Sequence, residues 1–121
     1  MSLTVISRIE DHFAILELSG SLTLGPTLNT LRETARQVLS SNKVSGIILE
    51  MAGVAVTDSS GLGELTVVYT VATNRKCPIR LATVSPSLKK MLEMTRIDEL
   101  LPAYPDVASA KADIKRKAAG A

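Results

Sequence analysis

The hydrophobic positions change their period several times along the chain, and each change marks a predicted element. Apolar side chains at positions 3, 5 and 9, followed by the run 13–18, predict a hairpin around the polar turn Glu10-Asp11-His12. From about Thr27 the apolar positions recur at three- and four-residue steps, which predicts a helix ending near Ser40-Ser41-Asn42.

Strands and helices alternate in the second half of the chain. The nearly continuous apolar run Val44 to Met51 predicts a strand covered on both faces, and Pro78 to Val84 predicts another. Ser85-Pro86-Ser87 begins a short helix, and the last helix is predicted from about Asp106 to Lys117. This order indicates an α/β domain with a mixed sheet of four to five strands and about four helices packed against it.

The segment from Leu62 to Asn74 carries two conflicting signals. It is rich in β-branched residues, which favour a strand. Its apolar positions recur at helical steps, and we predict a helix whose buried face carries Leu62, Leu65, Tyr69 and Ala72. The opposite face then carries Ser60, Glu64, Val67, Val71 and Asn74. The two valines are either covered by a neighbouring helix or form an exposed apolar strip that belongs to a docking surface.

The stretch Thr57-Asp58-Ser59-Ser60-Gly61-Leu62-Gly63 opens this helix. Asp and Ser at a helix start accept hydrogen bonds from the free N–H groups of the first turn, so capping accounts for them. Capping does not account for two glycines, each of which costs roughly 0.5–1 kcal/mol relative to alanine. We infer that another backbone approaches closely there, or that room is needed for a group added to a neighbouring side chain.

Composition and charge narrow the classes of function. The 121 residues fit one domain at 1–121, with a core at about 3–104 and a C-terminal helix and basic tail at 105–121. Phe13, Tyr69 and Tyr104 are the only aromatic residues, which argues against a stacking platform for nucleic acid. The formal net charge is +2, and basic residues gather in the tail, where a short basic segment is more often solubilising than nucleic-acid binding.

Catalytic and metal-binding signals are weak. Cys77 is the only cysteine, so the chain can form neither an intramolecular disulfide nor a cysteine-based zinc cluster. The only histidine, His12, lies at a predicted turn far from Ser59, which leaves that hydroxyl without a base. The sequence has no apolar run long enough to span a membrane and no signal-peptide pattern, so we expect a cytoplasmic protein that does not bind a membrane. It also has no phosphate-binding loop, and we expect that it is not an enzyme and needs no metal or cofactor.

The motif Asp58-Ser59-Ser60-Gly61-Leu62-Gly63 resembles the signature of STAS domains, specifically of the stand-alone bacterial anti-sigma factor antagonists. The resemblance runs from about Leu3 to Tyr104 and includes the flanks Ile47-Ile48-Leu49 and Ile79-Arg80-Leu81. In that family the Ser directly after the Asp is phosphorylated. The resemblance therefore implies Ser59 as the phosphorylation site, with Ser60 as the runner-up.

The resemblance also implies a regulatory cycle. The unphosphorylated antagonist binds an anti-sigma factor that is also a serine kinase and so frees a sigma factor for transcription. Phosphorylation ends the binding, and a serine phosphatase restores it. The residues expected to contact the partner are Asp58, Ser60, Gly61, Leu62, Gly63, Glu64, Val67 and Val71. The sequence departs from the family at Gly20-Ser21-Leu22-Thr23, where Thr23 replaces an expected acid.

The sequence leaves two other functions open. The domain could be an accessory subunit of a transporter or of a larger regulatory complex, in which the same loop docks without being phosphorylated. It could also bind a small ligand or nucleotide, using the helix start as an anion site. The second alternative is weaker because no lysine or arginine lies beside the motif.

Overall fold

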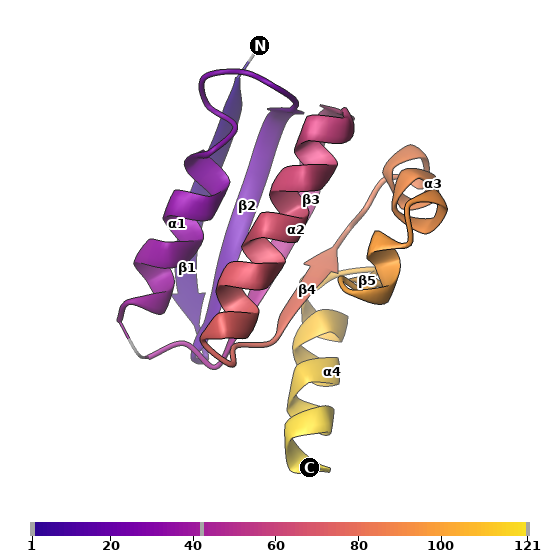
Figure 1. Ribbon diagram of the computed structural model, residues 1–121. Coiled ribbons are helices and arrows are strands. Elements are labelled where there is room, and N and C mark those ends of the chain that lie inside the picture. Colours follow the sequence, from indigo (N-terminus) through magenta and orange to yellow (C-terminus); the bar gives the residue numbers. More distant parts are fainter. Residues whose placement is uncertain (1, 42, 121) are drawn as a thin grey trace.

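The computed structural model describes residues 2–41 and 43–120. In chain order its elements are β1 (Leu3–Glu10), β2 (Phe13–Leu22), α1 (Thr30–Leu39), β3 (Gly46–Thr57), α2 (Ser59–Asn74), β4 (Ile79–Ala82), α3 (Pro86–Met94), a 3-10 turn (Ile97–Glu99), β5 (Ala103–Tyr104) and α4 (Val107–Ala119). The predicted α/β class, mixed sheet and four helices are confirmed (Figure 1).

The five strands form one sheet in the order β1-β2-β3-β4-β5. β1 runs antiparallel to β2, and the remaining neighbours are parallel. The hairpin between β1 and β2 turns through Asp11 and His12, which both adopt positive φ angles, of 54° and 67°. Two consecutive residues with positive φ match the twist of adjacent strands, so the chain reverses within two residues.

The helices cover both faces of the sheet and create two apolar clusters. Because successive strand residues point to opposite faces, Ile47 and Leu49 join the larger cluster, to which α1, α2 and α3 contribute. Ile48 lies in the smaller cluster, which α4 closes with Ala110 and Ile114. Figure 1 shows α1 and α2 side by side along the sheet, with α4 below β4.

Several element boundaries differ from those predicted. β3 extends to Thr57 rather than Met51, because residues 53–57 pair with the end of β2 although none of their side chains is buried. β3 therefore leads directly into Asp58. The first helix starts at Thr30 instead of Thr27 and ends at Leu39, and the predicted end point Asn42 lies outside the described residues.

The segment around Tyr104, for which the sequence pattern predicted no strand, forms the short strand β5 beside β4. The helical prediction for 62–74 is confirmed, and the helix begins three residues earlier, at Ser59. Tertiary packing therefore outweighs the β-branched composition of α2. Among the described residues, no helix combines the length and apolar character that crossing a membrane requires.

Candidate functional site

Asp58 fastens the start of α2 to the loop that follows β2. Its Oδ1 accepts a hydrogen bond from the Gly61 N–H at 2.9 Å, and its Oδ2 accepts one from the Leu24 N–H at 3.1 Å. These backbone hydrogen bonds, first from Gly61 and then from Leu24, lower the pKa of the Asp58 carboxyl from its usual value. The predicted capping role is confirmed, and the carboxylate also clamps a second loop.

Gly61 and Gly63 are glycines for different reasons. A Cβ atom on Gly61 would lie 1.9 Å from the Leu22 carbonyl oxygen, so only glycine allows β2 and α2 to approach this closely. A Cβ atom on Gly63 would meet no atom within 4 Å. The close approach that we inferred from the sequence is thus found at Gly61, while Gly63 leaves a bare patch of surface.

The two serines differ in exposure. Ser59, the first residue of α2, is exposed, and its hydroxyl makes no hydrogen bond to any described residue. Ser60 is partly buried. The Ser59 hydroxyl is therefore open to a modifying enzyme at a helix start, where the dipole and the free N–H groups favour added negative charge.

Three residues that the sequence placed on the docking face are buried. Gly61 and Leu62 face the core, and Leu62 is 6% exposed. Glu64 is 2% exposed, and its Oε1 lies 2.5 Å from Nη2 of Arg32 on α1. The helical projection assigned Glu64 to the solvent side because it could not anticipate this ion pair. These residues therefore support the surface from beneath and expose little of their side chains.

Val67 and Val71 are neither fully covered by a neighbouring helix nor fully exposed, which were the two alternatives that the sequence left open. α1 packs beside α2, and both valines are partly buried, with Val71 against the main core. Two apolar residues that the sequence analysis missed are more exposed: Leu24 is 76% exposed and Val56 is 42% exposed. Leu24 is an apolar residue in the mostly polar segment 19–27. This was the sequence signal that could have marked it as an exposed binding residue.

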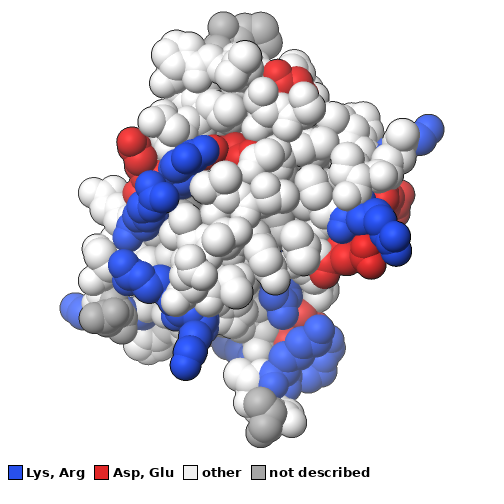
Figure 2. Space-filling model, viewed as in Figure 1, with Lys and Arg blue, Asp and Glu red and all other residues white. Residues whose placement is uncertain are grey.

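The surface at this end of the molecule carries little charge. Figure 2 shows that lysine and arginine gather along the side over α1 and toward α4, while the area over α2 is mostly uncharged. Asp58 is ionised within this neutral area. Such a surface suits close contact with another protein, which favours few unpaired charges at its centre.

The Ser59 hydroxyl has no histidine beside it among the described residues. His12 occupies the β1–β2 turn, whereas Ser59 follows the opposite end of β3, so the two side chains cannot form a catalytic pair. No cluster of three or more potential metal ligands occurs within residues 2–41 and 43–120. Burial raises the pKa of the Cys77 thiol to about 11, which leaves it an unreactive core residue.

Comparison with known proteins identifies the family. A STAS domain model matches residues 4–110, and the chain belongs to the STAS domain family. A crystal structure of an anti-sigma factor antagonist from Mycobacterium paratuberculosis aligns with a TM-score of 0.78 and 17% identity, covering 94% of this chain and 95% of that one.

Two further structures extend the likeness. SpoIIAA, an anti-sigma factor antagonist, in its unphosphorylated form gives a TM-score of 0.67 at 16% identity, covering 95% of this chain and 98% of that one. The murine anion transporter Slc26a9 gives 0.69 at 13% identity, covering 95% of this chain but 22% of the transporter. At these identities the likeness establishes a shared fold, and the resemblance to STAS domains found in the sequence is confirmed.

Proposed function

We propose that this protein is an anti-sigma factor antagonist whose binding to an anti-sigma factor is switched off by phosphorylation of Ser59. One observation carries the proposal: Ser59 presents a free hydroxyl at the start of α2, beside an ionised Asp58 and within a nearly uncharged surface. SpoIIAA, a neighbour in fold, has been solved in both unphosphorylated and phosphorylated forms, which supports a switch of this kind.

Phosphorylation acts on the interface and not on the free domain. The helix dipole favours a phosphate at an exposed helix start by only ~0.3–1 kcal/mol, whereas reversing a 99:1 population takes ~5.5 kcal/mol. Two like charges about 4 Å apart cost on the order of 4 kcal/mol at an intermediate dielectric. A partner that covers Ser59 and Asp58 would meet this repulsion together with the cost of desolvating the phosphate.

Each residue of the site has a role in this scheme. Ser59 accepts the γ-phosphoryl group of ATP on its Oγ, releasing ADP, and the partly buried Ser60 is the second choice. Asp58 holds the loop, Gly61 and Leu62 set the helix against the sheet, and Gly63 leaves the surface flat. In this scheme the partner also covers four apolar side chains that are exposed or partly exposed: Leu24, Val56, Val67 and Val71.

The partners that follow are an anti-sigma factor with serine kinase activity and a serine phosphatase that removes the group. Thr23, which stands where the family carries an acid, is half-buried next to Leu24. A partner that fits this chain therefore meets an uncharged residue at that point, which bears on which anti-sigma factor it recognises.

Binding of the host's anti-sigma factor kinase to three variants tests the proposal. Ser59→Ala should bind like wild type and stay bound after ATP is added. Ser59→Asp should bind at least ~10-fold more weakly, because it places a permanent charge beside Asp58. Ala108→Asp supplies the control, since it adds the same charge at the exposed first turn of α4. Equal binding by Ser59→Ala and Ser59→Asp would exclude the switch.

A second role, as the STAS subunit of a transporter or of a larger assembly, is favoured by the fold shared with Slc26a9. In that case the Ser59 loop binds the other subunit without being phosphorylated, and binding does not depend on phosphorylation. An operon encoding a transporter, together with Ser59→Asp retaining full affinity for it, would select this role over the first.

A further inference from the structure

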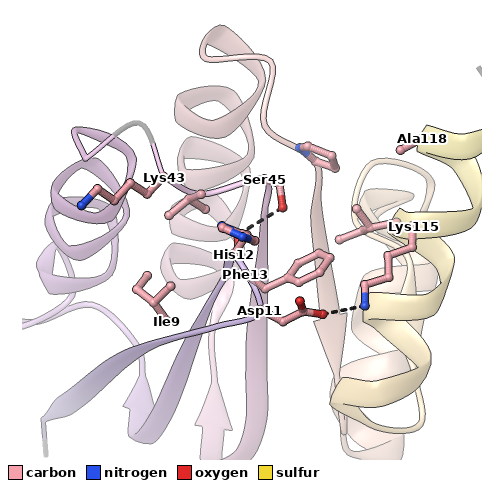
Figure 3. Close-up of a pocket in the computed structure, with 11 residues that line it drawn as sticks. Ile9, Asp11, His12, Phe13, Lys43, Ser45, Lys115 and Ala118 are labelled. Carbon is pink, nitrogen blue, oxygen red and sulfur yellow. Dashed lines mark hydrogen bonds and ion pairs between the residues drawn. The ribbon is translucent and has the colours of Figure 1, made fainter.

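A broad cavity lies at the end of the sheet opposite Ser59. Its volume is about 960 Å³, toward the upper end of the ~300–1,000 Å³ typical of small-molecule sites. Its apolar lining consists of Ile9, Phe13, Val44, Pro78, Ile114 and Ala118. These residues come from the β1–β2 hairpin, the segments that enter β3 and β4, and the last turns of α4 (Figure 3).

The wall formed by the hairpin and the start of β3 is fixed by backbone contacts. The carbonyl oxygen of His12 accepts hydrogen bonds from the N–H of Ser45 at 2.7 Å and from its hydroxyl at 3.1 Å. A Cβ atom on Gly46 would lie 2.9 Å from the Phe13 ring, so the backbone of β3 rests directly on that ring. This wall of the cavity is therefore preformed, and a ligand would not have to order it.

Among the residues that the structure describes, the rim carries one uncompensated positive charge. Nζ of Lys115 lies 2.6 Å from Oδ2 of Asp11, which neutralises that lysine (Figure 3). Lys43 is exposed at the rim and forms no ion pair with any described residue. Ile9, which is 52% exposed, offers apolar surface on the same wall. An apolar hollow with one unpaired lysine among the described residues of its rim matches a ligand with an aliphatic body and one negative charge.

We propose that this cavity binds an aliphatic monocarboxylate, with its chain over Ile9 and Phe13 and its carboxylate beside Lys43. A phosphate monoester carries up to two negative charges and is best held by an arginine fork or several cations, whereas the described part of this rim supplies one unpaired lysine. The site is separate from the Ser59 surface, because the two lie at opposite ends of the twelve-residue β3. A ligand bound in this cavity would therefore not contact the loop that carries Ser59.

Calorimetric titration of the whole protein with hexanoate, octanoate and decanoate tests the assignment. Affinity should rise roughly fourfold for each methylene that enters the cavity. Lys43→Gln should weaken decanoate at least fivefold and leave decanol unchanged, while the control Lys89→Gln, an exposed lysine on α3, should alter neither. Ala118→Phe, at an exposed position on α4, should fill the cavity and weaken every ligand at least tenfold.

Four results would overturn the proposal. The first is the absence of decanoate binding at millimolar concentration, and the second is undiminished binding by Ala118→Phe. The third is tighter binding of decyl phosphate than of decanoate, which would replace the monocarboxylate with a phosphate ligand. The fourth is a dimer, seen by light scattering, that Ala118→Phe dissociates, which would make this hollow a contact between two copies of the chain.

Discussion

Gly61 lies so close to Leu22 that a side-chain carbon on Gly61 would stand 1.9 Å from the Leu22 carbonyl oxygen. The same oxygen accepts a hydrogen bond from the Asp58 N–H at 3.3 Å. The end of β2, the end of β3 and the first turn of α2 are therefore joined through backbone atoms. Ser59, between Asp58 and Gly61, is held in one place by its neighbours while its own hydroxyl stays exposed.

The two glycines of the motif should respond oppositely to alanine. Gly61→Ala forces β2 and α2 apart and should lower the free energy of unfolding by roughly 1–3 kcal/mol or more. Gly63→Ala meets open space within α2 and should raise the free energy of unfolding by ~0.5–1 kcal/mol. Urea unfolding of both variants measures the difference. Equal effects of the two substitutions would contradict the close approach at Gly61.

The ion pair between α1 and α2 should contribute measurably to stability. Nη2 of Arg32 lies 2.5 Å from Oε1 of Glu64, whose side chain is 1% exposed. Arg32→Met leaves that carboxylate buried without its partner and should lower the free energy of unfolding by ~1–3 kcal/mol. This loss is smaller than that for a fully buried ion pair because the Arg32 side chain is 36% exposed.

A double-mutant cycle that pairs Arg32→Met with Glu64→Met measures the coupling. The control is the same cycle for Arg8 and Glu10, whose side chains are 41% and 46% exposed and should couple by ~0–1 kcal/mol. A coupling between Arg32 and Glu64 no larger than that of the control would show that the pair does not tie the helices together.

Asp113 should make stability depend on acid pH. The Tyr104 hydroxyl, followed by the Arg80 guanidinium, lowers the pKa of Asp113 from 3.8 to about 2. The folded chain thus releases this proton more readily than the unfolded chain does. The resulting stabilisation is complete above about pH 4 and is lost as the pH falls toward about 2.

Unfolding midpoints measured between pH 2 and 5 test this dependence. Wild type should lose stability through the window, and Asp113→Asn should show a flatter profile because it removes the titrating group. Tyr104→Phe removes the largest contribution to the low pKa and should move the loss of stability to higher pH. Identical profiles for wild type and Asp113→Asn would contradict the assignment.

Leu24 should be a binding residue rather than a folding residue. Its side chain is 76% exposed, and its link to the site is the backbone N–H that donates to Asp58, so Leu24→Ser keeps that hydrogen bond. We expect an unchanged unfolding midpoint and roughly 5–30-fold weaker binding of the anti-sigma factor.

Ile6→Ser is the matched control for Leu24. Ile6 is 61% exposed on β1 and pairs with Glu17, on the face of the sheet that α1 and α2 do not cover. Its substitution should leave partner binding unchanged. Similar losses of affinity for Leu24→Ser and Ile6→Ser, measured by surface plasmon resonance, would show that the interface is not centred on the Ser59 loop.

The sequence pattern predicted most of the strands and helices, and the helix start at Asp58, because these depend on local signals. Hydrophobic period separated strand from helix even in α2, and Asp58 followed by two glycines marked a helix start with a close backbone contact. The extension of β3 to Thr57 was missed because residues 53–57 are held by pairing with the end of β2 and not by burial of their side chains.

The surface of the site depends on contacts between distant residues, which no local pattern contains. Glu64 is buried because Arg32, 32 positions earlier, reaches it from another helix. Leu24 is brought to the site by a hydrogen bond to Asp58, 34 positions later. The cavity at the other end joins Ile9 to Ala118 from opposite ends of the chain.

The decisive experiment for the Ser59 switch measures affinity for the anti-sigma factor before and after complete phosphorylation, with the modified residue mapped by mass spectrometry. We expect one phosphate, on Ser59, roughly 100-fold or more weaker binding, and recovery after phosphatase treatment. A protein that carries phosphate on Ser59 and binds as tightly as before, or a kinase that leaves Ser59 unmodified, would contradict it.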